Sequence, residues 1–84
     1  MAKVLMYTAQ QCPYCIRAKA LLRHKGVPYQ EIDVSEDAVL REKMIEESGR
    51  RTVPQIFIND VPIGGFEELR ELDQGGELDR LLAA

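Results

Sequence analysis

Short apolar runs alternate with segments of helical character along this chain, and their order limits the folds open to it. A strand, a helix and a second strand predict a parallel pair of strands with a right-handed crossover. Two later runs joined by Asn59-Asp60 predict an antiparallel hairpin. Together they predict an α/β fold, a four-stranded mixed sheet flanked by helices. The predicted strands are 3–7, 27–34, 54–58 and 61–63. The predicted helices are 13–25, a second helix that Ser35 is expected to cap and Gly49 to end, 66–72 and 77–83.

The chain is long enough for one small domain, and we expect residues 1–84 to form it as a monomer. Hydrophobic residues make up 45% of the sequence and recur along its whole length, so a folded core is expected. No apolar run reaches the roughly 18 residues of a membrane span. The first residues lack the pattern of a secretory signal, so the expected location is the cytoplasm.

The net charge of −3 is unevenly distributed. Residues 1–30 contain no Asp or Glu and carry a charge of +5, whereas residues 31–84 carry −8. The basic part contains both cysteines. It forms either an ordinary solvated surface or a positive field that favours a thiolate and attracts anionic substrates. Nucleic-acid binding is not expected, because the chain is acidic overall and lacks the signature of a nucleic-acid module.

Cys12 and Cys15, in the stretch Cys-Pro-Tyr-Cys, are the chain's two cysteines. Their spacing leaves three roles open: a structural disulfide, half of a metal site, or a redox couple. A structural disulfide fits poorly with a chain that has no export signal and with so short a loop. A zinc site within one chain would need more Cys or His ligands. The single histidine, His24, lies two helical turns or more from Cys15. Only a metal shared between two chains therefore remains possible. We therefore expect a redox couple and no metal.

Cys12 lies where the first predicted strand meets the helix that Pro13 begins. The first N–H groups of a helix lack partners, and together with the helix dipole they favour an anion. A thiolate on Cys12 is such an anion, so Cys12 is expected to attack disulfides. Cys15 follows about one turn later, less exposed but within reach of a disulfide with Cys12. We expect Cys15 to displace the product from the mixed disulfide.

Three motifs carry a resemblance that covers essentially the whole chain. Cys-Pro-Tyr-Cys follows the first predicted strand, Arg-Thr-Val-Pro at 51–54 precedes the third, and Gly-Gly-Phe-Glu-Glu-Leu occupies 64–69. In order and spacing they resemble the dithiol class of the glutaredoxin family, and the length and strand order are similar to its small bacterial-type members. The resemblance implies a thioredoxin-like fold, glutathione as co-substrate, and Cys12 and Cys15 as the attacking and resolving thiols.

The resemblance also implies a set of glutathione-binding residues. Tyr14 would line the site beside the sulfur. The Thr52-Val53-Pro54 segment resembles the loop that holds a cis-proline in this fold, and the Val53 backbone would pair with the cysteinyl part of glutathione. The helix start after Gly64-Gly65 would bind the γ-glutamyl carboxylate. The implied glutathione-binding residues are Tyr14, Arg41, Thr52, Val53, Pro54, Gly65, Phe66 and Glu67.

This sequence differs from the family pattern at positions that usually carry charged side chains. Arg41 matches a position that often contacts the glycine carboxylate, and a carboxylate of Glu67-Glu68 would pair with the γ-glutamyl ammonium. That acidic pair stands where Asp or Ser-Asp is more usual. Ala9 stands three residues before the first cysteine, where many glutaredoxins have lysine. One expected cation is therefore absent, and Arg41 or Arg51 would have to compensate.

These features predict a glutathione-dependent oxidoreductase that reduces protein disulfides and protein–glutathione mixed disulfides. Its partners would be glutathione and disulfide-containing or glutathionylated proteins, and ribonucleotide reductase is a common partner in the family. Two alternatives stay open. The absent lysine at Ala9 fits a redoxin that thioredoxin reductase reduces. The other is a carrier of a glutathione-ligated iron–sulfur cluster, although Pro13 and Cys15 differ from the residues usual in such carriers.

Overall fold

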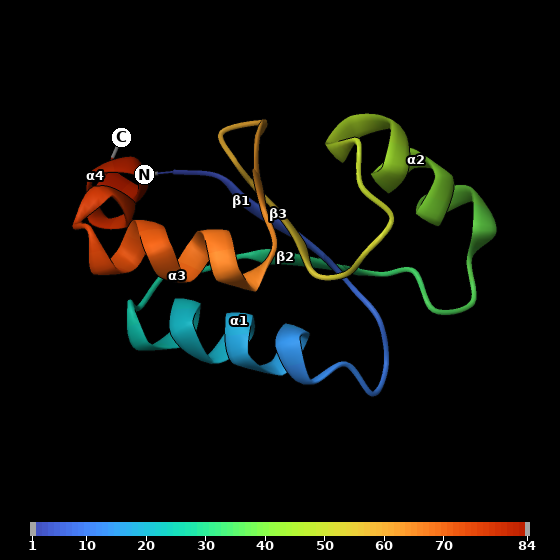
Figure 1. Cartoon of the computed structure of the whole chain (residues 1–84), viewed down its shortest axis with the longest axis horizontal. Helices are drawn as coiled ribbons and strands as arrows, with labels where there is room; N and C mark the ends of the chain where they lie inside the picture. Colours follow the sequence, from blue (N-terminus) through green and yellow to red (C-terminus); the bar gives the residue numbers. More distant parts are fainter. Residues whose placement is uncertain (1, 84) are drawn as a thin grey trace.

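Figure 1 shows a computed structural model in which strands and helices follow the predicted order. The structure describes residues 2–83, so the two ends of the predicted domain, residues 1 and 84, lie outside the described part. The strands are β1 (Val4–Thr8), β2 (Gln30–Asp33), β3 (Gln55–Ile58) and β4 (Val61–Gly64), and the helices are α1 (Pro13–His24), α2 (Ala38–Ser48), α3 (Phe66–Gln74) and α4 (Glu77–Ala83).

The strands form one mixed sheet in the order β2-β1-β3-β4. β1 lies parallel to β2, with Tyr7 opposite Ile32, and antiparallel to β3. β3 and β4 form an antiparallel hairpin, and its turn residues Asn59 and Asp60 have positive φ angles of 52° and 66°. Two positive φ angles in a two-residue turn suit the right-handed twist of the strands. The predicted parallel pair and hairpin are confirmed.

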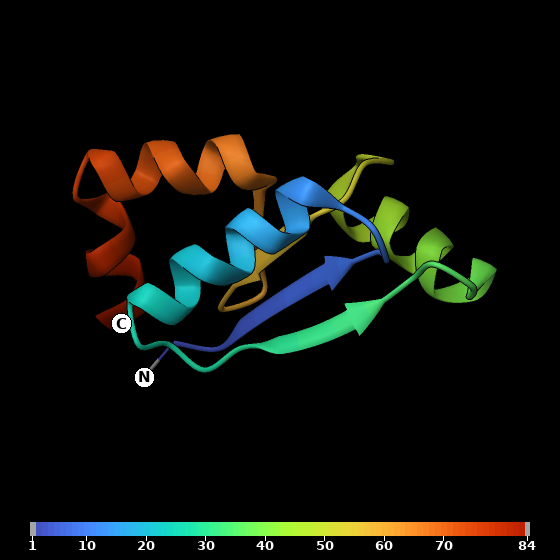
Figure 2. The ribbon, with the colours of Figure 1, turned by 90° about the horizontal axis from the view of Figure 1, so that it is seen from below.

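Helices cover both faces of the sheet (Figures 1 and 2). Side chains alternate between the two faces along each strand, so the core divides into two clusters. α1, α3 and α4 pack on one face, and α2 packs on the other. This packing holds the start of α1 beside the end of β1. The buried members of the first cluster are Val4, Met6, Ala18, Leu22, Ile56, Ile58, Leu69 and Leu78, and those of the second are Tyr7, Val34, Met44 and Phe57.

The start of α2 differs from the sequence prediction. Asp37 is the N-cap, and its side chain accepts a hydrogen bond from the Leu40 N–H at 3.0 Å. The prediction that Ser35 caps this helix is wrong, because the Ser35 hydroxyl oxygen accepts a hydrogen bond from the Gln10 N–H at 2.7 Å. Ser35 therefore ties the segment after β2 to the loop that leads into Cys12.

Several other boundaries shift by one to three residues. β2 covers only part of the predicted strand 27–34, because the Val27 N–H bonds back to the Leu22 carbonyl and closes the end of α1. α1 ends at His24, one residue before the predicted end, with Lys25 as its C-cap. α3 continues to Gln74, two residues beyond the predicted end.

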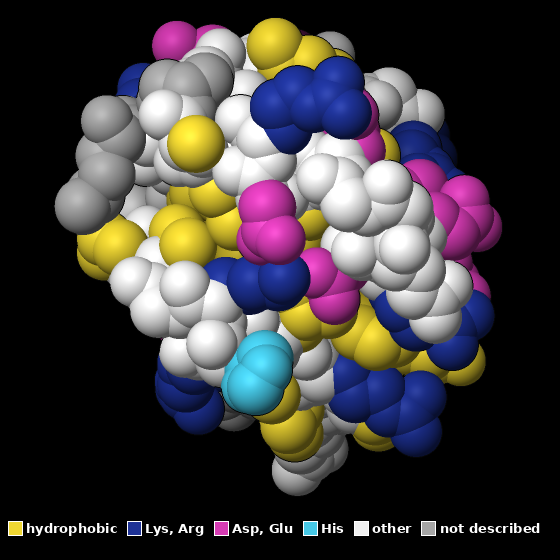
Figure 3. All heavy atoms as spheres, turned by 90° about the vertical axis from the view of Figure 1, so that its left-hand side faces the viewer, with side chains coloured by type: hydrophobic (Ala, Val, Ile, Leu, Met, Phe, Trp, Pro, Cys, Tyr) yellow, Lys and Arg dark blue, Asp and Glu magenta, His cyan; other side chains and the backbone are white. Residues whose placement is uncertain are grey.

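The charge segregation seen along the sequence is largely balanced in the fold. Three of the five basic residues of segment 1–30, namely Lys3, Lys19 and Lys25, form ion pairs with carboxylates of segment 31–84. The Lys25 ammonium lies 2.6 Å from Asp73 and 2.9 Å from Asp79, and so joins the end of α1 to α3 and α4. Figure 3 shows basic and acidic side chains next to one another at this end of the molecule.

Gly64, at the end of β4, has a φ of 118°, a conformation that favours glycine. A Cβ atom there would lie 2.6 Å from Glu68 Oε1 and 2.9 Å from Arg50 Nη1. We therefore expect Gly64→Ala to lower the free energy of unfolding by about 1–3 kcal/mol, measured by denaturant titration. Gly75→Ala is the matched control, because its φ is −83° and its nearest neighbour atom lies at 3.5 Å. Equal stability of the two variants would contradict the expectation.

Candidate functional site

Cys12 is the N-cap residue of α1, directly after the loop that leaves β1. Its Sγ accepts a hydrogen bond from the Cys15 N–H at 3.2 Å, and Pro13 occupies the first helical turn, where no N–H is needed. A helix N–H aimed at the sulfur stabilises its anionic form. Because Cys12 is also partly exposed, it is the cysteine that an incoming disulfide meets.

Cys15 lies one turn further along α1 and is only 1% exposed. Burial, followed by the hydrogen bond with Cys12, raises the pKa of the Cys15 thiol to about 12. Both cysteines are free thiols in this structure. One exposed sulfur at a helix start and one buried sulfur beside it give the asymmetry that thiol–disulfide exchange between two cysteines needs.

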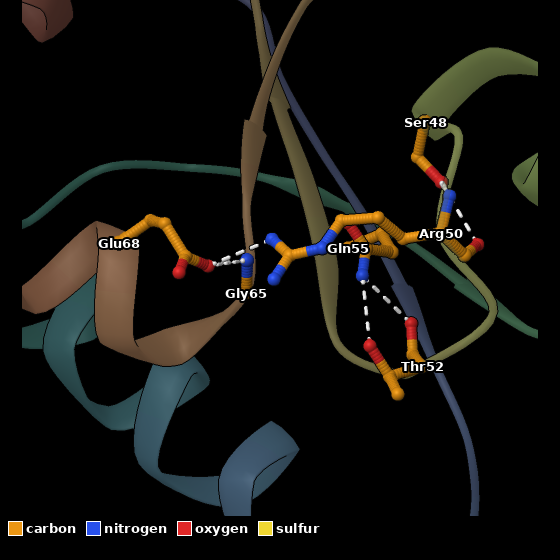
Figure 4. A network of polar contacts seen from close by, with 6 residues as sticks. All are labelled: Ser48, Arg50, Thr52, Gln55, Gly65 and Glu68. Carbon is orange, nitrogen blue, oxygen red and sulfur yellow. Dashed lines mark hydrogen bonds and ion pairs between the residues drawn. The ribbon is translucent and has the colours of Figure 1, made fainter.

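The loop before β3 faces Cys12. The Val53–Pro54 peptide bond is cis, as the resemblance implied for the Thr52-Val53-Pro54 segment. The Cys12 thiol points at the Val53 carbonyl oxygen, with 3.8 Å between the sulfur and the oxygen. The buried Gln55 side chain supports the loop, because its Nε2 donates to the Thr52 carbonyl at 2.8 Å and to the Thr52 hydroxyl at 3.2 Å (Figure 4).

A groove of about 270 Å³ runs beside this loop. Tyr14 and Phe66 lie in it with their ring centroids 6.3 Å apart, and the Arg17 guanidinium lies 5.3 Å from the Tyr14 ring centroid. The groove therefore joins an aromatic wall, a backbone segment and the start of α3. Its lining residues are Tyr14, Arg50, Thr52, Val53, Pro54, Gly65, Phe66, Glu67 and Glu68.

An ion pair connects two walls of the groove (Figure 4). Glu68 Oε1 accepts a hydrogen bond from the Gly65 N–H at 2.7 Å and lies 3.0 Å from Arg50 Nη1. The Gly65 hydrogen bond, followed by the Arg50 contact, holds the pKa of Glu68 below its usual value. Glu67, one residue earlier, instead pairs with Arg70 on α3 at 2.7 Å.

Most of the predicted glutathione-binding residues meet in this groove. Tyr14, Gly65, Phe66, Glu67 and the Thr52-Val53-Pro54 segment all line it. Arg41 does not: it lies on α2 and is absent from the groove lining.

Sequence reasoning missed Arg50, and it named Glu68 only as one of an acidic pair, without its contact to Gly65; both residues line the groove. The signal for Arg50 was its position directly after Gly49, which ends α2 with a φ of 73° and turns the chain toward the groove. The signal for Glu68 was its place in the first turn of a helix that starts at a glycine, where a carboxylate bonds back to the free N–H.

Within the described part of the chain, residues 2–83, no three or more His, Cys, Asp or Glu side chains come together in a group that could hold a metal ion. Each helix within it is too short or too polar to cross a lipid bilayer.

The thioredoxin-like fold and the asymmetric cysteine pair define a thiol–disulfide oxidoreductase. The glutaredoxin family model matches residues 4–63. The chain is 56% identical to Glutaredoxin 3 of Escherichia coli over 82 residues, which cover 98% of this chain and 99% of that protein. This chain therefore belongs to the glutaredoxin family.

Solved structures agree with this assignment. The solution structure of glutaredoxin from Brucella melitensis is 52% identical, with a TM-score of 0.86 over 98% of this chain and 89% of that one. The crystal structure of a buckwheat glutaredoxin–glutathione complex is 28% identical, with a TM-score of 0.89 over 98% of this chain and 77% of that one.

Proposed function

We propose that this protein uses glutathione to reduce protein disulfides and protein–glutathione mixed disulfides. The observation that carries the proposal is the position of the groove beside Cys12: the Cys12 sulfur lies 3.8 Å from the carbonyl oxygen of Val53, which lines the groove. The buckwheat relative was solved as a glutaredoxin–glutathione complex, which supports the same ligand here. The proposal places the reaction in the cytoplasm, where glutathione keeps thiols reduced.

The groove offers a partner for each part of glutathione. The Val53 backbone would pair with the cysteinyl backbone, as in a short added strand. The free N–H groups at the start of α3 would bind a γ-glutamyl carboxylate, and the carboxylates of Glu67 and Glu68 would attract the γ-glutamyl ammonium. Arg50 is the cation of the groove lining and would attract a glutathione carboxylate, the role that the sequence suggested for Arg41.

The reaction follows from the two sulfurs. The Cys12 thiolate attacks one sulfur of the substrate disulfide, forms a mixed disulfide and releases the other sulfur as a thiolate. Cys15 then attacks Cys12 Sγ, or a glutathione thiolate attacks the mixed disulfide in its place. Two glutathione molecules return an oxidised Cys12–Cys15 pair to the dithiol and leave as glutathione disulfide. Disulfide-bonded proteins, with ribonucleotide reductase as one candidate, would act as substrates of a monomeric enzyme.

The residue at position 9 favours one alternative function. A lysine at that position would be a further cation near the thiolate, and its absence fits a redoxin that takes electrons from thioredoxin reductase. The rival uses the same two cysteines but not the groove.

A comparison of electron donors tests the proposal against its rival. NADPH oxidation is followed with glutathione plus glutathione reductase, and separately with thioredoxin reductase alone, using one mixed-disulfide substrate. We expect turnover with the glutathione system and at most about a tenth of that rate with thioredoxin reductase, because the proposal assigns the groove to glutathione, and the rival function makes no use of the groove. Efficient turnover with thioredoxin reductase and none with glutathione would overturn the proposal.

A further inference from the structure

A polar cluster of Lys19, Glu31 and Thr8 joins α1 to β1 and β2. Figure 2 shows α1 lying over these two neighbouring strands. Lys19 Nζ on α1 lies 3.0 Å from Glu31 Oε2 on β2. The same carboxylate oxygen accepts a hydrogen bond from the Thr8 hydroxyl at 2.8 Å, and Thr8, at the end of β1, is only 1% exposed. Three elements therefore hold the Lys19 ammonium in one place, with 22% of its side chain exposed.

Lys19 follows Cys15 by four residues on the same helix. Residues at this spacing are neighbours on one helix face. Cys15 points into the protein and is 1% exposed, and the Lys19 ammonium is drawn toward the sheet on that side by Glu31. The cation is thus held on the buried side of α1, one turn from the resolving sulfur.

The resolving step requires a thiolate on Cys15, although the buried position of this residue disfavours a negative charge. Cys15 must lose its proton before it attacks, yet burial removes the water that would solvate the thiolate. Burial and the hydrogen bond with Cys12 raise the pKa of the Cys15 thiol to about 12, whereas a backbone hydrogen bond from Ala9 and the positive charge of Lys19 act to lower it. Of these two opposing influences, only Lys19 is a side chain that a substitution can remove.

We propose that Lys19 is a positioning residue for the resolving thiol, and that its ammonium, anchored by Glu31 and Thr8, stabilises the Cys15 thiolate during attack on Cys12. This inference rests on the dithiol step of the proposed function. In that step the Cys15 thiol gives its proton to solvent, and the thiolate forms a bond to Cys12 Sγ. The bond between Cys12 Sγ and the substrate sulfur breaks, and its electron pair leaves with the substrate thiolate, which is thereby reduced.

Other charged groups near Cys15 and Lys19 limit how strongly Lys19 stabilises the Cys15 thiolate. On α1, Cys12 and Lys19 act on Cys15. From the segment that carries β2, Glu31, Tyr29 and Asp33 interact with Lys19. The hydrogen bond to Glu31 keeps the pKa of Lys19 above its usual value, against the opposing effect of burial. Glu31 thus keeps Lys19 charged across the physiological range, but also offsets part of its field. A moderate effect of Lys19 on Cys15 is therefore expected.

A two-phase kinetic experiment without glutathione distinguishes the reaction of Cys12 from the reaction of Cys15. Reduced protein is mixed with an aromatic disulfide whose released thiolate is coloured. The first phase reports attack by Cys12, and the second reports attack by Cys15 on the mixed disulfide. Lys19→Gln is expected to slow the second phase about threefold to tenfold near neutral pH, to shift its pH profile upward, and to leave the first phase unchanged. Lys19→Arg keeps the charge and is expected to restore the second phase.

Lys25→Gln is the matched control, because it breaks ion pairs at the far end of the same helix. It is expected to leave both phases at the wild-type rate. An unchanged second phase in Lys19→Gln, or equal slowing in the two variants, would overturn the inference. The probe in this experiment is not glutathione, so the two proposals can fail separately. If Lys19→Gln slows the second phase but the donor comparison shows no turnover with glutathione, glutathione is not the co-substrate and the role of Lys19 is still supported.

Discussion

Replacing Cys12 by serine is expected to abolish turnover with every disulfide substrate, with a loss of about three orders of magnitude or more. A serine hydroxyl is not ionised at neutral pH and does not form the mixed disulfide through which exchange proceeds. The buried Cys15 does not replace it, because burial raises the pKa of its thiol and the residue is only 1% exposed to an incoming disulfide. Coupled assays with a mixed-disulfide substrate measure the loss.

Stability and structure serve as the control for this variant. Cys12 is partly exposed and is not a member of either core cluster, so the free energy of unfolding of the serine variant is expected to lie within about 0.5 kcal/mol of the wild-type value. Activity above a few per cent in a folded Cys12→Ser protein would mean that Cys15 attacks substrates directly, and the assignment of roles would be wrong.

Replacing Cys15 by serine is expected to separate two reactions. Reduction of protein disulfides by the dithiol route is lost, because nothing within the chain then displaces Cys12 from the mixed disulfide. Deglutathionylation is expected to persist within a few-fold of the wild-type rate, because a second glutathione displaces the first from Cys12. The two rates are measured side by side on a protein disulfide and on a glutathionylated peptide.

The buried position of Cys15 calls for a second variant. A serine hydroxyl without a partner at this site costs about 1–3 kcal/mol, whereas Cys15→Ala buries no polar group. The alanine variant is therefore expected to be better folded and to show the same separation of activities. If both variants lost the two reactions equally while remaining folded, Cys15 would not be the resolving thiol.

The redox centre could be predicted from sequence because its geometry is local. The helix start at Pro13 places Cys12 at the cap and Cys15 one turn inward, and the structure confirms both positions. The hairpin turn at Asn59-Asp60 and the end of α2 at Gly49 are equally local, and both have the positive φ angles that their residue types favour.

The charged wall of the groove could not be predicted in the same way. Arg41 matched a family position, yet the cation in the groove lining is Arg50. The groove forms where the turn after α2 meets the start of α3, and only the folded chain shows which arginine reaches that meeting point. The same holds for the acidic pair, because Glu68 bonds back to Gly65 while Glu67 pairs with Arg70.

Two residues of suitable type precede α2, and only one of them forms its N-cap. Ser35 and Asp37 both suit an N-cap. The hydroxyl of Ser35 is occupied by the Gln10 N–H of another loop, so Asp37 caps the helix. The ion pair of Lys19 with Glu31 likewise joins α1 to β2, and no local pattern predicts such a contact.

Trapping of the mixed disulfide tests the central claim most directly. Reduced Cys15→Ser protein, whose single remaining thiol is Cys12, is incubated with glutathione disulfide, and its intact mass is measured. The account predicts one glutathionyl group per chain at Cys12, together with nuclear magnetic resonance shifts at Val53, Gly65 and Glu68 as the groove is filled. No adduct, or an adduct that leaves the groove resonances unmoved, would contradict the claim that Cys12 and the groove form one glutathione site.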